Sequence, residues 1–251
     1  MGKTQALLID GDIILHRFGH ANQTKVTWEV DAEPSIAVGN PDVAINAVEE
    51  FVDGLSTKFH GGEPIICFSG PRNFRYAVLE SYKWNRKNLE KPVLFNVLKG
   101  HLWSNYVCLM QDTLEGDDLM GIMSTEARGK YIICSIDKDM LQIPGRHYNW
   151  NHQRRSIVTV HQGNYFFYRQ ILTGDPGDGY TGIPGCGPVK ADKILDRLEG
   201  QPHEIIWKAI TDAYESAGLC EADAIKQARV ARILRKGDYN FETKEVKLWT
   251  P

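Results

Sequence analysis

The chain has 251 residues, of which 42% are hydrophobic and 24% are charged, and this composition is typical of a folded globular protein rather than a disordered one. No apolar run approaches the ~20 residues that a membrane-spanning helix needs, and no signal-peptide pattern stands at the N-terminus, so we expect a cytoplasmic protein. A net charge of −3 argues by itself against a nucleic-acid-binding protein, but basic residues form local groups that each suit a phosphate.

The first two-thirds of the chain alternates between strand and helix patterns. Residues 6–9 form a short apolar run that ends at Asp10, and residues 41–59 have the apolar spacing of a helix. Residues 64–68 and 131–136 are further β-rich runs, with a helical pattern over 117–128 between them. This order predicts an α/β fold with a central, mainly parallel sheet flanked by helices. Because ligands bind outside the carboxyl ends of parallel strands, the polar residues that follow these strands should meet in one crevice.

Residues 72–109 have an irregular pattern in which aromatic residues alternate with basic ones, and we interpret this stretch as an arch or insertion. Cations among aromatics suit backbone contact and base stacking in single-stranded nucleic acid, although a solvated helix face has a similar composition. The nucleic-acid contacts predicted here are Arg75, Tyr82, Lys83, Arg86 and Lys87.

The remainder of the chain is predicted to be mainly helical. Residues 157–160 fit one strand of a hairpin, a glycine-rich turn region over 174–187 leads into a helix at about 189–198, and helical patterns continue to residue 234 before a tail. Glycines before a helix start let the backbone approach a phosphate, so Gly182, Gly185, Gly187 and Lys190 are candidate DNA contacts. A plain turn explains these four residues equally well, and the ending required for a P-loop is missing.

Two weaker patterns receive structural interpretations. The five cysteines contain no C-x-x-C pair, which favours buried, reduced thiols over a disulfide or zinc framework. His16 and His20 have helical spacing but no third metal ligand, so we assign them packing or surface roles.

Carboxylates gather in four short clusters, and this is the strongest chemical signal in the sequence. Each cluster alone is explained by helix capping or a turn, but several near strand ends would repel one another unless cations neutralise them. A carboxylate-rich set that is poor in His and Cys favours Mg²⁺ or Mn²⁺, and two such ions about 4 Å apart can drive phosphodiester hydrolysis. The clusters are Asp10 with Asp12; Glu115 with Asp117 and Asp118; Asp137 with Asp139; and Asp175 with Asp178.

Three blocks resemble the 5′ nuclease or flap endonuclease family, especially the short 5′-3′ exonucleases of bacteriophages. They are Glu115-Gly116-Asp117-Asp118, Ser135 to Asp139, and residues 173–191, and the resemblance extends over roughly Leu7 to Leu198. It implies an α/β nuclease core over residues 1–160, which includes the arch, and a helical region over 161–251. Within that region, residues 170–198 would form the family's helix–three-turn–helix, which grips duplex DNA and often holds K⁺.

The resemblance also implies roles for individual residues. Lys83 and Arg86 would hold the scissile phosphate at the base of the arch, with Tyr82 available to stack on a base. Two Mg²⁺ or Mn²⁺ ions would be the cofactors, held at a first site by Asp10, Glu115, Asp117 and Asp118, and at a second by Asp137, Asp139, Asp175 and Asp178.

One position departs from the family pattern. The family commonly has an aspartate at the end of the strand before the arch, whereas this chain has Ser69 between Phe68 and Gly70. Ser69 can hydrogen-bond a metal-bound water but cannot neutralise charge, so Asp12 is a candidate to compensate as part of the metal's outer shell.

The function expected from these patterns is metal-dependent hydrolysis of DNA at a free 5′ end, flap, nick or gap, with RNA primers in RNA–DNA hybrids as a further substrate. The enzyme would act as a monomer in phage DNA metabolism, in the host cytoplasm. Two alternatives stay open: an RNA-directed nuclease of the PIN-like class, which usually lacks the 174–191 block, and a non-catalytic binder of branched DNA, which Ser69 suggests but Asp137 and Asp139 oppose.

Overall fold

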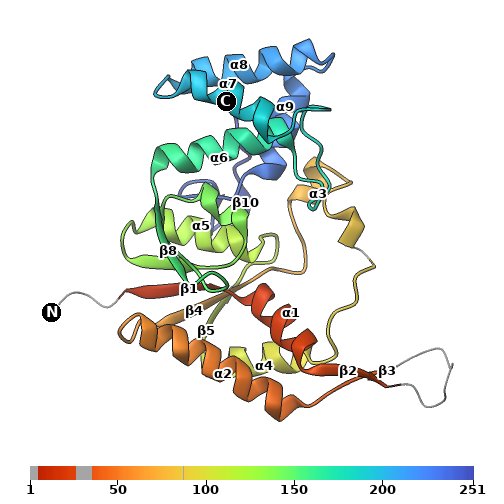
Figure 1. The fold of residues 1–251 in the computed structure, drawn as a ribbon, viewed down its shortest axis with the longest axis vertical. Coiled ribbons are helices and arrows are strands. Elements are labelled where there is room, and N and C mark those ends of the chain that lie inside the picture. The colour runs from red at the N-terminus through yellow and green to blue at the C-terminus, as the bar shows by residue number, and fades with distance from the viewer. Residues whose placement is uncertain (1–4, 27–35, 87) are drawn as a thin grey trace.

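Figure 1 shows a computed structural model of the chain, which describes residues 5–26, 36–86 and 88–251. Lys87, one of the predicted DNA contacts, lies outside the described residues.

A six-stranded sheet in the order β5-β4-β1-β6-β7-β8 forms the centre of the molecule. The first five strands run parallel, and β8 is antiparallel to β7 as the predicted hairpin requires. The predicted α/β class with a mainly parallel sheet is therefore confirmed. The strands are β1 (Ala6–Asp10), β4 (Pro64–Phe68), β5 (Val107–Met110), β6 (Tyr131–Cys134), β7 (Gly145–Asn149) and β8 (Arg154–Val158).

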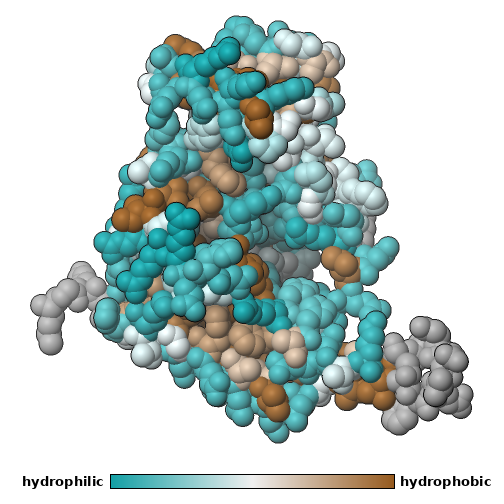
Figure 2. Space-filling view, viewed as in Figure 1, coloured by the Kyte–Doolittle hydropathy of each residue, from teal (hydrophilic) through white to brown (hydrophobic). Residues whose placement is uncertain are grey.

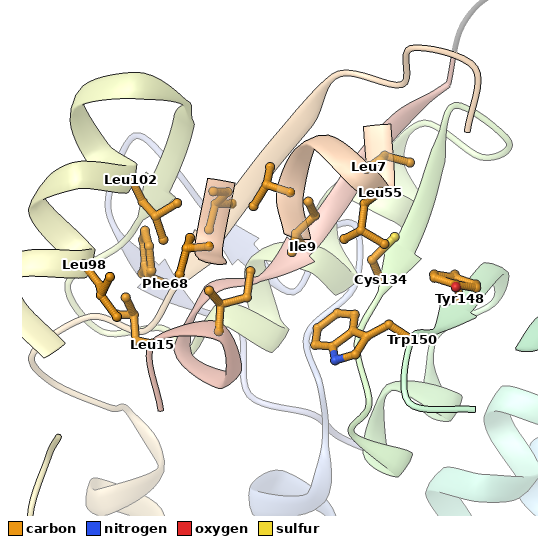
Figure 3. Packing of buried hydrophobic residues seen from close by; sticks show 14 of the residues in the cluster. Leu7, Ile9, Leu15, Leu55, Phe68, Leu98, Leu102, Cys134, Tyr148 and Trp150 are labelled. Carbon is orange, nitrogen blue, oxygen red and sulfur yellow. The ribbon is translucent and has the colours of Figure 1, made fainter. Parts of the chain in front are cut away.

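Helices bury both faces of this sheet. Along β1, Leu7 and Ile9 point into one core and Leu8 into the other, because successive side chains of a strand face opposite ways. The first core, seen in Figure 3, packs against α1, α2 and α4, and the second packs against α5. These helices are α1 (Gly11–Ala21), α2 (Pro41–Lys58), α4 (Phe95–Asn105) and α5 (Gly116–Glu126).

The irregular segment that the sequence predicted over residues 72–109 ends before residue 95. Its first part holds only the short helix α3 (Arg75–Val78) and the 3₁₀ helix η1 (Trp84–Arg86). Residues 95–110, however, form α4 and the edge strand β5, so the irregular structure predicted up to residue 109 is wrong there. The cause is burial: Leu98 and Leu102 on α4 are fully enclosed in the first core.

The C-terminal part is helical, as predicted, and stacks beyond the sheet at the top of Figure 1. Its helices share a third core that also takes in Tyr82. The last residues are not a free tail, because they form a small hairpin and Trp249 packs on the third core. The elements of this part are α6 (Val160–Thr173), α7 (Pro188–Leu195), η3 (Asp196–Leu198), α8 (His203–Ser216), α9 (Glu221–Ala231), β9 (Tyr239–Asn240) and β10 (Glu245–Val246). The 3₁₀ helix η2 (Lys138–Gln142) lies earlier, between β6 and β7.

A second small hairpin, β2 (Gln23–Val26) with β3 (Ile36–Gly39), projects from the body at the lower right of Figure 1. In the view of Figure 2 the surface is largely hydrophilic, with hydrophobic patches that include one at this hairpin. Among the helices of the described residues, none combines the length and apolar character needed to cross a bilayer.

All five cysteines are free; three are buried as predicted, whereas Cys108 is half-buried and Cys220 is exposed.

The packing of α4 can be tested by substitution. Leu98→Ala should lower the free energy of unfolding by about 2–5 kcal/mol, because it leaves a cavity between α4 and the sheet. The neighbouring Val97 is 43% exposed, so Val97→Ala should change it by less than about 0.5 kcal/mol. Urea titration followed by circular dichroism measures the free energy of unfolding of both variants. Equal, small losses would contradict the burial of α4 against the sheet.

Candidate active site

A cleft of about 510 Å³ opens at the carboxyl end of the sheet. It brings together eight residues singled out in the sequence from five separate segments: Asp10, Asp12, Ser69, Lys83, Arg86, Glu115, Asp117 and Asp137. The expectation that polar residues after successive strands converge on one crevice is therefore confirmed.

Asp10 ends β1 and caps α1. One carboxylate oxygen accepts a hydrogen bond from the Ile13 backbone N–H (3.1 Å), and the other accepts from the Ser135 hydroxyl (2.9 Å). Burial, followed by the nearby charges of Asp12 and Asp137, raises the pKa of Asp10 from 3.8 to about 7 despite these hydrogen bonds. Asp10 is thus a carboxylate that needs a further positive partner to stay ionised.

Ser69 joins the ends of three elements. Its backbone N–H donates to the Asp12 carboxylate (2.9 Å), and its hydroxyl oxygen accepts from the Gly116 N–H at the start of α5 (3.1 Å). Through these two hydrogen bonds, Ser69 at the end of β4 holds the starts of α1 and α5 in place. Asp12 is held at the cleft wall as a result.

The neighbours Asp117 and Asp118 have opposite environments. Asp117 faces the cleft, where burial and then the charges of Asp10, Asp137 and Glu115 raise its pKa well above the usual value. Asp118 is fully buried and forms a bidentate ion pair with Arg75 at 2.7 and 2.8 Å. It also accepts from the backbone N–H groups of Glu115 and Leu234, both at 3.1 Å.

This geometry corrects two predictions. Asp118 is not placed to bind a metal, since both of its oxygens are saturated by Arg75 and backbone donors away from the cleft. Arg75 is not a DNA contact, since its guanidinium is 2% exposed and also donates to the backbone carbonyls of Val230 (2.9 Å) and Arg232 (2.6 Å).

The Glu115 carboxylate is surrounded by cations and a hydroxyl group on one side of the cleft. Its carboxylate contacts the Lys83 ammonium, lies 3.2 Å from the Arg75 guanidinium and accepts from the Tyr82 hydroxyl at 2.9 Å. Burial alone would raise the pKa of Glu115, but Lys83 and Arg75 lower it to about 2. Tyr82 is 2% exposed, so the predicted stacking of its ring on a base is wrong.

Lys83 and Arg86 link this group to Asp178. The Lys83 ammonium lies 3.7 Å from the Asp178 carboxylate, and Arg86 pairs with the other oxygen of that carboxylate. Lys83 has a φ of +51°, a left-handed conformation that its backbone N–H secures by donating to the Asp178 carbonyl at 2.8 Å. Burial lowers the pKa of the Lys83 ammonium, and Glu115 and Asp178 reverse that effect and raise it.

A second carboxylate group lies beside the first. Burial, then Asp137 and Asp175, raise the pKa of Asp139 to about 7, and Asp139 accepts a hydrogen bond from the Gln170 side chain at 2.8 Å. Asp175 pairs with Lys138 at 3.0 Å. Burial also raises the pKa of Asp178, although Lys83 and Arg86 oppose it. Asp137 acts on both groups, because its charge raises the pKa of Asp10 in the first and of Asp139 in the second.

These donors fit a hydrated divalent cation. In the part of the chain that the structure describes, no three His, Cys, Asp or Glu side chains are close enough to enclose a metal directly. Mg²⁺ keeps several water ligands and takes only one or two carboxylates directly, so an open cleft with repelling carboxylates suits it better than a closed protein cage.

Residues 182–187 of the glycine-rich turn between α6 and α7 do not line the cleft, whereas Asp178 of the same turn pairs with the cleft residues Lys83 and Arg86. Gly182 is buried, and a Cβ there would lie 2.3 Å from the Gly174 backbone nitrogen, so this glycine serves chain packing and its predicted DNA contact is wrong. Gly185, Gly187 and Lys190 are exposed and remain candidate contacts.

Four cleft residues were missed in the sequence: Ile13, His16, Arg17 and Tyr76. His16 had been given a packing or surface role. The missed signal on α1 is helical spacing, because His16 follows Asp12 by four residues and Arg17 follows Ile13 by four, which places each pair on one side of the helix. Tyr76 lies on α3 and has no such spacing.

The N-terminal resolvase-like domain of 5′-3′ exonucleases matches residues 5–166. The chain belongs to the 5′-3′ exonuclease family. It is similar to the exonuclease of Escherichia phage T7, with 28% identity over 98% of this chain and 93% of that protein. It also resembles the flap endonuclease Xni of Shewanella piezotolerans, with 23% identity over 77% of this chain and 82% of the relative.

Solved structures show that this 5′-3′ exonuclease family member shares its fold with other nucleases. The phage T5 D15 protein, co-crystallised with metal ions, superposes with a TM-score of 0.61 at 16% identity, over 90% of this chain and 93% of the other. The catalytic core of Rad2 in complex with DNA gives 0.53 at 13% identity, over 86% and 65%.

The repulsion among cleft carboxylates predicts an unusual pH dependence for this 5′-3′ exonuclease family member. A carboxyl group whose pKa is raised by folding destabilises the fold as it ionises, so without divalent metal the free energy of unfolding should fall from pH 5 to pH 8 by on the order of a few kcal/mol. Glu115 has the opposite sign, but its contribution is lost only below its unfolded pKa of 4.5.

Chemical unfolding in EDTA at several pH values measures this fall. Asp10→Asn keeps a good capping residue for α1 and should flatten the pH dependence, whereas the matched control Asp42→Asn, at an exposed position of α2, should keep it. Stability that rises or stays constant over this range would contradict the crowding of the carboxylates.

Proposed function

We propose that the chain hydrolyses phosphodiester bonds of DNA at or near a free 5′ end, with two Mg²⁺ or Mn²⁺ ions as cofactors. The observation that carries this proposal is the set of repelling carboxylates in one open cleft, with Lys83 and Arg86 on the same wall. Family membership and metal-bound T5 structures support it.

The carboxylates divide into two proposed metal sites. Asp10, Glu115 and Asp117 serve the first, with Asp12 and Ser69 available to hold metal-bound water, and Asp137, Asp139, Asp175 and Asp178 serve the second. Bound divalent cations would supply an activated water and stabilise the negative charge on the departing oxygen. The low pKa of Glu115 keeps one full negative charge in place before any cation arrives.

Lys83 and Arg86 are proposed to position the scissile phosphate. Both cations now pair with carboxylates of the cleft, so a phosphate oxygen would enter a region where positive charge is already oriented. The buried Arg75 keeps Glu115 aligned with Lys83 and does not itself reach the substrate.

The turn between α6 and α7 is proposed to hold duplex DNA. Gly187 caps α7 without a side chain, Pro188 has no N–H, and the Lys190 N–H donates to the Gly187 carbonyl at 3.0 Å. The groups proposed to meet a phosphate are therefore the Val189 N–H and the Lys190 ammonium in the first turn. A K⁺ ion bound by this turn is part of the proposal. DNA complexes of Rad2 and of the T5 flap endonuclease support contact with DNA.

The substrates proposed are DNA flaps, nicks, gaps and 5′ ends, together with RNA–DNA hybrids, acted on by a cytoplasmic monomer. The competing functions are cleavage of RNA by a PIN-like nuclease and non-catalytic binding of branched DNA. Ser69 is the observation that favours the binder, but its hydrogen bonds to Asp12 and Gly116 give it a structural purpose that is compatible with catalysis.

Cleavage assays on 5′-flap, nicked and single-stranded substrates, in DNA and RNA versions, test the proposed activity. With Mg²⁺ we expect cleavage of DNA, and with EDTA none. Asp137→Asn should reduce the rate by more than about 100-fold, because even substitutions behind a metal ligand cost up to that factor, while binding in EDTA persists. Glu50→Gln, at an exposed position of α2, is the matched control and should cleave normally.

Intact DNA after long incubation with Mg²⁺ would favour the binder, and preferential cleavage of RNA would favour the PIN-like nuclease. Normal turnover by the Asp137 variant would remove this residue from the metal sites.

The salt dependence of duplex binding tests the turn before α7. Lys190→Ala should weaken binding to all sequences equally and reduce the slope of log affinity against log salt by about 1, as expected for the loss of one phosphate contact. Lys130→Ala, an exposed change at the amino end of β6, should leave the slope unchanged. Equal salt slopes for both variants would mean that duplex DNA does not contact Lys190.

A further inference from the structure

Helix α7 and the residues after it separate their charges onto two faces. Lys190, Lys193 and Arg197 recur at spacings of three and four residues and share one face of the helix. Three carboxylates of the same segment instead line a groove beside the helix. They are Asp192, Asp196 and Glu199.

The acidic face lines a groove against α6, which we call the acidic groove. Its outer part has a volume of about 470 Å³ and contains Tyr165, Phe166 and Arg169 of α6 opposite Asp196 and Glu199. An inner cavity of about 120 Å³ shares Tyr165 and Glu199 with it, so the two are continuous.

The walls of the acidic groove are held in place by hydrogen bonds. The Tyr165 hydroxyl donates to Asp196 (2.7 Å) and to Asp192 (3.2 Å), and Arg169 pairs with Asp192 at 2.6 Å. Arg169 thereby neutralises Asp192. Asp196 and Glu199 form no ion pair with any residue that the structure describes, so the groove keeps net negative charge.

The inner cavity of the acidic groove has a mixed lining. Leu195, Leu198 and Ile206 supply apolar surface, and His161, Asn164, Gln201 and His203 are among its polar residues. The three aliphatic side chains provide a contact surface for an aliphatic side chain of a ligand. The acidic groove thus offers an apolar seat beside two exposed carboxylates.

This combination excludes DNA as the occupant, because phosphates would meet Asp196 and Glu199. We propose that the acidic groove binds a positively charged peptide segment of a partner protein, with an aliphatic side chain in the inner cavity and Lys or Arg side chains at Asp196 and Glu199. Charge complementarity selects this partner and rejects nucleic acid. Lys190, Lys193 and Arg197 do not line the groove, so a duplex on these cations and a peptide in the groove can be held together.

The test uses the full chain and a fluorescein-labelled peptide with one central leucine flanked by two arginines on each side. Anisotropy at physiological salt should show saturable binding. Asp196→Asn combined with Glu199→Gln should weaken it by about tenfold, as expected for the loss of two exposed ion pairs. The amide oxygen that Asp196→Asn introduces would still accept the Tyr165 hydrogen bond, so the wall of the groove is kept.

The matched control is Asp212→Asn combined with Glu215→Gln, which removes the same charge from exposed positions of α8 and should leave peptide affinity unchanged. A peptide with serine in place of leucine should bind more weakly to the unmodified chain. Equal affinities of the two double variants, or of the two peptides, would overturn the proposal, as would a groove variant that loses duplex affinity instead. DNA cleavage is expected to be normal in both double variants, so this result is independent of the nuclease activity.

Discussion

The buried ion pair between Arg75 and Asp118 is the contact on which the arrangement of the active site depends. Arg75 donates to Asp118 and to the carbonyls of Val230 and Arg232, and Asp118 accepts from the backbone of Glu115 and Leu234. One pair of side chains thereby joins the segment after β4, the start of α5 and the chain beyond α9. Removing either partner of such a pair would leave an uncompensated buried charge.

The Arg75–Asp118 ion pair also determines where the neighbouring carboxylates lie. The hydrogen bonds to both Asp118 oxygens fix the N-terminus of α5. The adjacent residue Asp117 therefore lines the cleft that also contains Asp10. Glu115 is balanced by Lys83 and Arg75, whereas Asp10, Asp117 and Asp139 are not balanced by any cation of comparable proximity in the described residues. The site therefore contains one carboxylate that is already paired with protein cations, beside carboxylates whose charge only a bound metal would balance.

The sequence predicted the sheet and the convergence of the cleft carboxylates well, because strand ends in a parallel sheet must meet on one edge. It could not separate Asp117 from Asp118, since adjacent positions on a helix point in different directions and only the tertiary fold shows which one meets Arg75. The same limit explains Arg75 and Tyr82, whose basic and aromatic character resembled a nucleic-acid surface but which are buried partners of Asp118 and Glu115. The placement of individual metal ligands and of domain boundaries stays a prediction.

The left-handed backbone at Lys83 sets a limit on how this protein can change. A lysine in that conformation costs roughly 1 kcal/mol relative to glycine, yet glycine would remove the ammonium that reaches Glu115 and Asp178. Backbone strain and ion pairing therefore oppose each other at a single position. Removing the ammonium would leave the buried Glu115 carboxylate without its nearest cation, which costs more than the strain that glycine relieves, so stability and turnover both favour the lysine.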